Sequence, residues 1–508
     1  MIAGEEWDIC IIGGGATGLG AAVDSASRGY KTILFEKYDF AKGTSSRSTK
    51  LIHGGVRYLE QLNIKLVLES LHERGLMLKN APHLVKNQSF VVPNYEWWES
   101  SYYGIGLKAY DWMAGRLGLG PSEFLSVEET LAAIPTLDPE GLRGGIRYHD
   151  GQFDDARMAI HLAMTAADLG AVVFNYFPLE SFIKENDKIT GVNARDALNN
   201  EAYAIKAKVI VNATGVFSDE IRKLDAPDAE GMLSPSQGIH IVLDKEFLPA
   251  ETAILIPRTD DGRVLFAVPW HDKIIVGTTD TAVEQVSIEP KALATEIEFV
   301  LHALRDYLTK EPTHDDIRSI FCGLRPLVKG GAKSTAGLSR DHLITVSDSG
   351  LISIMGGKWT TYRKMAEDVI NTAIKKAGLP FIKSTTDSLP IHGNKMETNF
   401  NDPDYYYGSD RDKVNTICNE RAEWNKRIHH AFPYLIGEII WAVREEMCMH
   451  IEDFLARRTR MLFLDAKAAI ESTPGVAKTM AEELKTNENW IRDEVDSFTS
   501  LALQYLPG

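Results

Sequence analysis

A strand, a glycine turn and a helix near the N-terminus constrain the fold more than any other feature. The run WDICIIGGGATGLGAAVDSASRGYKTILFEK predicts a buried strand over 9–12, then a helix and a second strand ending at Glu36. Gly13, Gly15 and Gly18 fit G-x-G-x-x-G: they allow the turn, close approach of a pyrophosphate, and tight helix–strand packing. Glu36 follows Gly13 by 23 residues, near the spacing at which a carboxylate binds ribose hydroxyls. The pattern predicts an α/β dinucleotide-binding unit.

Hydroxyl residues after the second strand favour FAD over NAD, because such a loop can wrap the outer phosphate and continue toward a flavin. Two later segments, KVIVNATGVFSDEI and LISIMGGKWTTYRKMAEDVI, again run from a strand into glycines and a helix N-terminus, which suits phosphate binding. Three ordinary strand–turn–helix units would explain the structure but not the repeated glycine and hydroxyl residues. The predicted cofactor-binding residues are Gly13, Gly15, Thr17, Gly18, Glu36, Thr44, Ser45, Ser46, Ala213, Thr214, Gly215, Gly357, Lys358 and Thr360.

Composition excludes several classes of protein. The 508 residues carry a net charge of −16, so we expect no nucleic-acid partner. No apolar run reaches the roughly 20 residues of a membrane-spanning helix, and the acidic start does not resemble a signal peptide. The four cysteines (Cys10, Cys322, Cys418 and Cys448) are widely spaced, which predicts structural thiols in a reducing compartment and no metal site.

Several motifs resemble the FAD-dependent glycerol-3-phosphate dehydrogenase family. They are IIGGGATGLGAA, GTSSRSTKLIHGGVRYLE, VNATGVFSDEI, RVLFAVPWHDKIIVGTTD, GLRPLV and GGKWTTYRKMAE, spread over about the first 370 residues. IEDFLARRTRMLFLD is similar to the family's helical C-terminal domain. The resemblance implies oxidation of sn-glycerol 3-phosphate to dihydroxyacetone phosphate, with electrons passing through FAD to a quinone. We expect FAD to be bound non-covalently, because no histidine or cysteine suggests covalent attachment and Cys10 lies inside the first strand.

That chemistry needs a base for the hydroxyl proton and cations for the phosphate. His53 precedes two glycines, which lets its backbone approach the flavin, and imidazole titrates near neutral pH. Arg57 offers a planar fork suited to phosphate oxygens. The resemblance adds His240 as a second imidazole, Arg325 as a phosphate ligand and Lys358 beside the flavin. Without it, these three read as a structural histidine, a turn-capping arginine and a solvated loop lysine.

The expected architecture is a Rossmann-like FAD-binding domain interleaved with a mixed β-sheet substrate domain, followed by an all-α domain. The predicted boundaries are 1–90, 150–230 and 335–385 for FAD binding, 91–149 and 231–334 for substrate binding, and 395–508 for the helical domain. The segment RVLFAVPWHDKIIVGTTD predicts a hairpin, and the polar stretch 399–412 predicts a linker.

Two regions leave alternatives open. The segment Tyr95–Gly120 is rich in Trp and Tyr, which suits either a membrane–water boundary or a buried cluster. Its Glu96 and Glu99, where bacterial members of the family often carry basic residues, weaken the case for attraction to anionic lipid. Arg457, Arg458 and Arg460 suit a partner or membrane contact, a solvated face, or packing on the FAD-binding domain.

Rival functions remain at this level. An oxidase that passes electrons to oxygen fits the same motifs, whereas amine and amino-acid oxidases of similar architecture do not share KLIHGGVRY. A non-catalytic flavin-binding module would not require His53, Arg57, Arg325 and Lys358 together. We expect a cytoplasmic protein attached peripherally to the inner face of the cell membrane, and a homodimer stays open.

Overall fold

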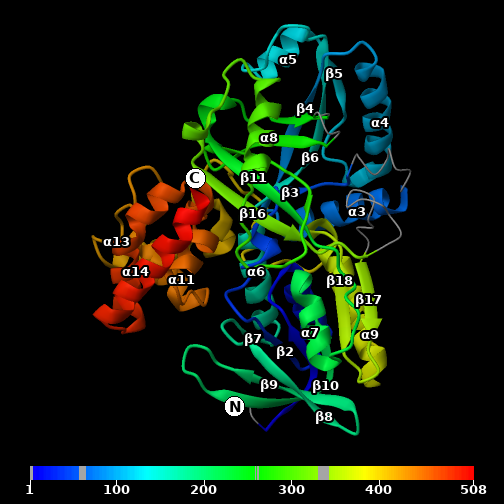
Figure 1. Cartoon of the computed structure of the whole chain (residues 1–508), viewed down its shortest axis with the longest axis vertical. Coiled ribbons are helices and arrows are strands. Elements are labelled where there is room, and N and C mark those ends of the chain that lie inside the picture. The colour runs from blue at the N-terminus through cyan, green and yellow to red at the C-terminus, as the bar shows by residue number, and fades with distance from the viewer. Residues whose placement is uncertain (1–3, 56–63, 258, 260–262, 330–341, 508) are drawn as a thin grey trace.

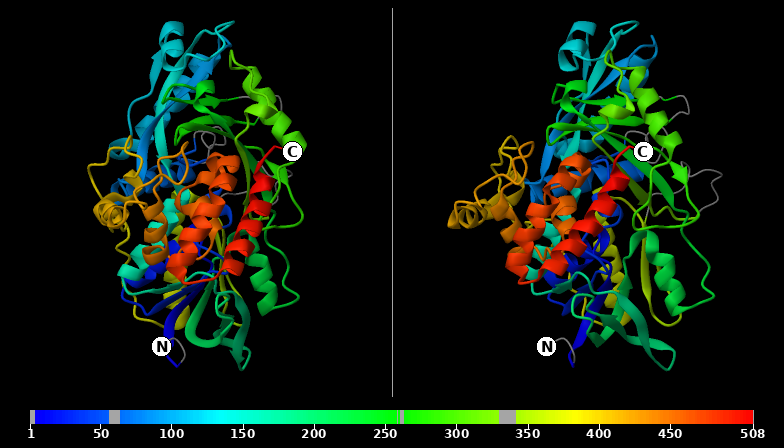
Figure 2. Two further views of the ribbon diagram at one scale, coloured as in Figure 1. Left: turned by 90° about the vertical axis from the view of Figure 1, so that its left-hand side faces the viewer. Right: turned by 60° about the vertical axis from the view of Figure 1, so that its left-hand side comes forward.

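Two β-sheets stand end to end, and a group of C-terminal helices packs beside the junction between them (Figures 1 and 2). The computed structural model describes residues 4–507 except 56–63, 258, 260–262 and 330–341, and no side chains for 100–102 and 116. Within these described residues, the first sheet has eight strands and the second has ten. This arrangement confirms the predicted fold class.

The first sheet is built around the N-terminal strand. β1 (Glu6–Ile12) pairs in parallel with β2 (Thr32–Phe35) on one side and β10 (Ala202–Asn212) on the other. β7 (Val172–Phe174) and β18 (Ile352–Gly356) continue the parallel sheet beyond β2 and β10. β2 is buried along its length, and so are the C-terminal parts of β1 and β10, because helices pack on one face of the sheet and residues 177–194 pack on the other. The added strands β8 (Leu179–Glu185), β9 (Lys188–Arg195) and β17 (His342–Val346) are antiparallel.

Helix α1 (Ala16–Ser27) lies directly after β1, as the glycine motif predicts. It packs between α6 (Asp155–Asp168) and α9 (Tyr362–Ala377), so residues from three distant parts of the chain form this layer. The predicted strand–helix–strand unit is therefore confirmed.

The second sheet carries the region predicted to bind substrate. β11 (Ser236–Asp244) lies between β14 (Lys273–Gly277) and β16 (Ser319–Arg325), both antiparallel. β13 (Leu265–Trp270) and β14 form the predicted hairpin, whose turn residues His271 and Asp272 have φ of 47° and 58°. The other strands are β3 (Leu51–Ile52), β4 (Val85–Asn94), β5 (Glu123–Leu125), β6 (Gly144–Phe153), β12 (Ala253–Ile256) and β15 (Thr281–Ala282). β3 and β4 both pair with β6 in this sheet, and the domain boundaries stay a prediction.

The C-terminal helices share one hydrophobic core with α1, α6 and α9. The predicted linker contains a 3₁₀ helix, Tyr405–Asp410, with Tyr406 and Tyr407 buried against the guanidinium of Arg157. The aromatic pair therefore packs this stretch onto helix α6, which its polar composition does not suggest. The helices are α10 (Arg411–Glu420), α11 (Ile436–Glu445), a π-helix at Asp453–Arg458, α12 (Met461–Leu464), α13 (Ala466–Leu484) and α14 (Glu488–Ala502).

The remaining helices are α3 (Ile64–Asn80), α4 (Glu99–Ala114), α5 (Val127–Ala133), α7 (Ser218–Asp225) and α8 (Ala294–Arg305). Among the described residues, no helix is both long and apolar enough to cross a bilayer.

Helix α4 is apolar on both of its faces. Leu107 and Tyr110 are buried on one side, whereas Ile105 and Trp112 on the other side are 74% and 84% exposed. Trp97, just before the helix, is 78% exposed. Each alternative for the aromatic segment thus finds residues that suit it, on opposite sides of one helix.

Candidate active site

The glycine turn brings β1, β10 and α1 into close contact. Gly13 has φ of 110°, and a Cβ there would lie 2.6 Å from the carbonyl oxygen of Ala213. A Cβ on Gly18 would lie 1.8 Å from the carbonyl oxygen of Gly13. Neither position tolerates a side chain, so both glycines are required for the close packing of the turn against β10 and α1. The predicted residues Ala213, Thr214 and Gly215 follow β10 at the same edge, and Thr17 lies in the first turn of α1.

Glu36 lies directly after β2, beside this turn. Its Oε2 accepts a hydrogen bond from the Gly14 amide at 2.6 Å, and its Oε1 accepts one from the Tyr38 amide at 2.9 Å. Burial raises the pKa of the carboxyl group, while the two amides act in the opposite direction. A carboxylate has lone pairs beyond these two bonds, so Glu36 fits the predicted role toward ribose hydroxyls.

Residues 43–55, which we call the cofactor segment, connect the glycine turn to the second sheet. Ser45 Oγ accepts a hydrogen bond from the Ala16 amide at 2.9 Å, in the first turn of α1. Thr44 Oγ1 donates to the Leu324 carbonyl at 2.7 Å, on β16. The Ser46 hydroxyl is buried without a hydrogen-bond partner in the described part of the chain. An orphaned hydroxyl beside a glycine turn fits a dinucleotide with its own polar groups.

An arginine of the C-terminal helical region binds the backbone of the cofactor segment. The Ser46 carbonyl oxygen accepts hydrogen bonds from Lys50 Nζ and Arg460 Nη2, both at 2.7 Å. The same two cations bind Asp155, at 2.7 Å to Oδ2 and 3.0 Å to Oδ1. Burial lowers the pKa of Lys50 to about 7, against the opposing effect of Asp155. A residue of the helical domain therefore helps to shape the predicted cofactor site.

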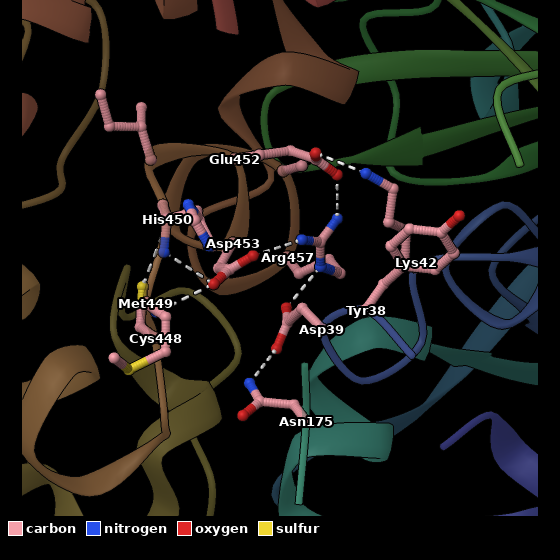
Figure 3. Close-up of polar contacts among 12 residues, drawn as sticks. Tyr38, Asp39, Lys42, Asn175, Cys448, Met449, His450, Glu452, Asp453 and Arg457 are labelled. Atoms are coloured by element: carbon pink, nitrogen blue, oxygen red, sulfur yellow. Dashed lines mark hydrogen bonds and ion pairs between the residues drawn. The ribbon is translucent and has the colours of Figure 1, made fainter. Parts of the chain in front are cut away.

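A second buried cluster fixes the chain just after Glu36 (Figure 3). Asp39 Oδ2 lies 2.5 Å from Arg457 Nε and 2.6 Å from Arg458 Nη1. Burial opposes the charge of Asp39, but the two guanidinium groups outweigh it and lower the pKa of this carboxyl to about 2. Arg457 also binds Glu452 at 2.7 Å, and Lys42 binds the other oxygen of Glu452 at 2.6 Å. Of the three alternatives for the arginines, packing on the predicted FAD-binding domain is the one that the contacts support, since all three are buried and bind Asp39 or the Ser46 carbonyl oxygen.

His240 and Arg325 share one face of the second sheet. Arg325 pairs with Ser236, and His240 lies four residues further along β11, so their side chains point to the same side. Glycines make room for both: a Cβ on Gly238 would lie 2.4 Å from Arg325 Nη2, and one on Gly277 would lie 2.3 Å from His240 Cδ2. Burial lowers the pKa of His240 well below its usual value, which keeps the imidazole neutral.

The cofactor segment also contacts His240 directly. Thr49 Oγ1 lies 2.9 Å from His240 Nε2, a contact that fixes the orientation of the ring. The Arg325 guanidinium donates to Thr278 Oγ1 at 3.0 Å and to the Thr279 carbonyl at 2.9 Å, and 22% of its side chain is exposed.

His53 and Lys358 lie where the cofactor segment meets residues 351–370, which we call the third glycine segment. Thr360 Oγ1 lies 3.5 Å from the His53 carbonyl oxygen, and Lys358 Nζ donates to Ser70 Oγ of α3 at 2.7 Å. Gly357, with φ of 78°, forms the turn directly before Lys358. Four of the five predicted catalytic residues thus lie on or beside the cofactor segment. The fifth, Arg57, lies outside the described residues, and the roles of all five stay predictions.

Comparison with known proteins agrees with this geometry. The family described as FAD dependent oxidoreductase matches residues 8–363, and the C-terminal domain of alpha-glycerophosphate oxidase matches residues 354–490. The chain is therefore an FAD-dependent oxidoreductase. Mitochondrial glycerol-3-phosphate dehydrogenases from Homo sapiens and Macaca fascicularis are 40% and 39% identical, over 96% and 97% of this chain and 71% and 72% of theirs. The chain belongs to the glycerol-3-phosphate dehydrogenase family.

Solved structures extend the comparison. A glycerol-3-phosphate dehydrogenase from Bacillus halodurans, complexed with FAD, is 30% identical, with a TM-score of 0.82 over 99% of this chain and 96% of that one. An L-alpha-glycerophosphate oxidase from Mycoplasma pneumoniae is 19% identical with a TM-score of 0.59 over 75% of this chain and 97% of that one, which shows a shared fold alone.

Proposed function

We propose that the protein oxidises sn-glycerol 3-phosphate to dihydroxyacetone phosphate and passes the electrons to a membrane quinone. One observation carries the proposal. The cofactor segment contacts the first turn of α1 through Ser45 and the sheet bearing His240 and Arg325 through Thr44 and Thr49. A substrate on that sheet would therefore lie beside the cofactor. The names of relatives at 38–41% identity support the same substrate.

Bound FAD supplies the acceptor for the hydride on the substrate's C2 carbon. His53 takes the proton of the C2 hydroxyl group, so that the carbon–oxygen double bond forms as the hydride leaves. His240, kept neutral by burial, is the second candidate for this base. Arg57 and Arg325 hold the phosphate dianion, and Lys358 places a positive charge at the third glycine segment.

Phosphate recognition gives the sharpest test. A charge-assisted hydrogen bond contributes about 1.5–3 kcal/mol, so Arg325→Ala should lower kcat/KM for glycerol 3-phosphate by about 10- to 150-fold. The weak activity on glycerol, which lacks the phosphate, should change little. Arg318→Ala is the matched control, because Arg318 precedes the same strand and pairs with Asp244 at the surface. An equal loss on both substrates would mean that Arg325 is structural, and Lys358 would become the next candidate.

The base is tested by single-turnover reduction of the flavin. His53→Ala should slow this step by about 10² or more, while the FAD content stays near that of the wild type. Reduction at the wild-type rate would transfer the role to His240 or to solvent.

The electron acceptor is tested with lipid and oxygen. The exposed side chains of Trp97, Ile105 and Trp112 suit contact with a bilayer, where a quinone resides. Vesicles should raise turnover with quinone, Trp112→Ser should weaken this stimulation, and little peroxide should form in air. Stoichiometric peroxide at comparable turnover would favour the oxidase alternative. Peripheral attachment to the inner face of the cell membrane is part of this proposal.

A further inference from the structure

The buried side of α4 reaches the segment that carries His53. Tyr110 Oη accepts a hydrogen bond from the Gly54 amide at 2.7 Å. The same oxygen donates to Asp150 on β6, at 2.8 Å from Oδ2 and 3.0 Å from Oδ1. Gly54 directly follows His53, so this bond fixes the peptide unit that joins the two residues.

Asp150, which binds the tyrosine oxygen, is itself held in place by Arg74. Arg74 of α3 donates through Nη1 to Asp150 Oδ1 at 2.6 Å, and through Nη2 to the Leu117 carbonyl at 3.3 Å. Tyr110, Arg74 and Asp150 are all buried. Burial raises the pKa of the Tyr110 phenol well above its usual value, so the hydroxyl keeps its proton. With one hydrogen, it donates to the carboxylate and accepts from the amide.

Gly54 lets the backbone pass close to the tyrosine. A Cβ on Gly54 would lie 2.6 Å from Leu71 Cδ2 and 2.7 Å from Tyr110 Oη. The glycine therefore lets the chain approach the phenol closely, and residue 54 has no side chain of its own to fix the backbone.

We propose that Tyr110 is a positioning residue for His53 and acts through the Gly54 amide. The inference rests on the proposed function, in which His53 takes the substrate proton. Because effective proton transfer depends on placement within a fraction of an ångström, a displaced peptide unit would slow the reaction without weakening phosphate binding. Tyr110 is not a catalytic residue on this view, since it contacts only the segment that holds one.

The variant that tests this is Tyr110→Phe, which keeps the ring and removes the oxygen. We expect anaerobic flavin reduction by glycerol 3-phosphate to slow by about tenfold or more, with the substrate Kd changed less than about twofold. Tyr148→Phe is the matched control. Tyr148 lies on β6 and is buried like Tyr110, but among the described residues its hydroxyl group bonds to neither Gly54 nor Asp150. An equal loss in Tyr148→Phe, or a Tyr110→Phe rate equal to that of the wild type, would overturn the inference.

The double variant separates this inference from the role of His53. In a His53→Ala background, Tyr110→Phe should cause no further slowing, because the residue that it positions is gone. A full tenfold loss there would mean that Tyr110 acts elsewhere and would overturn the inference. A His53→Ala enzyme of wild-type rate would refute the base assignment and the inference together.

A measurement on the wild-type holoenzyme covers the case in which Tyr110→Phe fails to fold. The Gly54 amide should be protected from hydrogen exchange, in a peptide spanning residues 50–55, because its acceptor is buried. Exchange of that amide at the rate of an open chain would overturn the inference. Protection in the wild type, with faster exchange in any folded Tyr110→Phe protein, would support it.

Discussion

Replacing Asp39 with Asn should destabilise the holoprotein by about 3–5 kcal/mol, the usual cost of removing one partner from a buried ion pair. The carboxylate lies 2.5 Å from Arg457 Nε and 2.6 Å from Arg458 Nη1, and all three side chains are buried. A pKa lowered from 3.8 to about 2 corresponds to about 2–3 kcal/mol of interaction with the charged form. The remainder comes from two guanidinium groups left without that charge.

The assay is urea denaturation of the holoprotein, followed by tryptophan fluorescence and by release of FAD. Because Asp39 follows Glu36 closely, flavin release should move to lower urea together with the first unfolding transition. Glu483→Gln is the matched control: Glu483 pairs with Arg444 at the surface, with side chains 22% and 38% exposed, and the loss should stay below about 1 kcal/mol.

A double-mutant cycle with Arg458→Met isolates the pair itself. The second substitution should cost less in the Asp39→Asn background than in the wild type, by about 1 kcal/mol or more. The reasoning fails if Asp39→Asn costs no more than the surface control, or if the two substitutions add without coupling.

Three further outcomes follow from the described contacts. His392 lies 2.5 Å from Asp168 and 2.6 Å from Asp410, and hydrogen bonding to Asp410 is the first cause that raises its pKa from 6.5 to about 8. The contribution of the charged His392 to stability is therefore complete below pH 6.5 and is lost as the pH rises through 8. The difference in Tm between wild type and His392→Gln should shrink from pH 6 to pH 9. A difference that stays constant would contradict this. Gly18→Ala should give protein without FAD, measured as the ratio of flavin to protein absorbance, because its Cβ would lie 1.8 Å from the Gly13 carbonyl; a variant with full flavin content would contradict that. Acid precipitation of the wild type should release all FAD into the supernatant, whereas a yellow pellet would show covalent attachment.

The strand–turn–helix unit at the N-terminus could be predicted from sequence because its signals are local. Gly13, Gly18 and Glu36 lie within one short stretch of sequence. A side chain at either glycine would clash with a backbone carbonyl oxygen, so the turn itself requires both glycines. The hairpin at His271 was predictable for the same reason, since two alternating strands flank a short polar turn.

The ionic clusters could not be predicted in this way. Asp39 and Arg458 are 419 residues apart, and nothing in either local sequence names the other. Lys50 and Asp155 likewise read as ordinary surface residues until the fold buries them together. The three arginines left three alternatives open because their pattern shows charge but not what faces it.

Helix α4 shows an intermediate case. Its aromatic content does not indicate which side chains are buried, so the sequence alone does not decide between the two alternatives for this segment. Leu107, Tyr110 and Ala114 recur at the spacing of one helix face, and all three are buried. This spacing is the sequence pattern that indicates the buried face of the helix. No local pattern indicates the hydrogen bond from Gly54 to Tyr110, because the two residues are 56 positions apart.

The contact between Arg460 and the Ser46 carbonyl oxygen has a consequence for biosynthesis. A nascent chain emerges from the ribosome N-terminus first, and its domains generally fold in that order. The glycine turn and the cofactor segment are made early, yet one of the two cations on that carbonyl is 414 residues away. The cofactor segment therefore cannot reach its final hydrogen-bonded state until Arg460 has left the ribosome, so tight capture of FAD should follow synthesis of the helical region that carries this arginine.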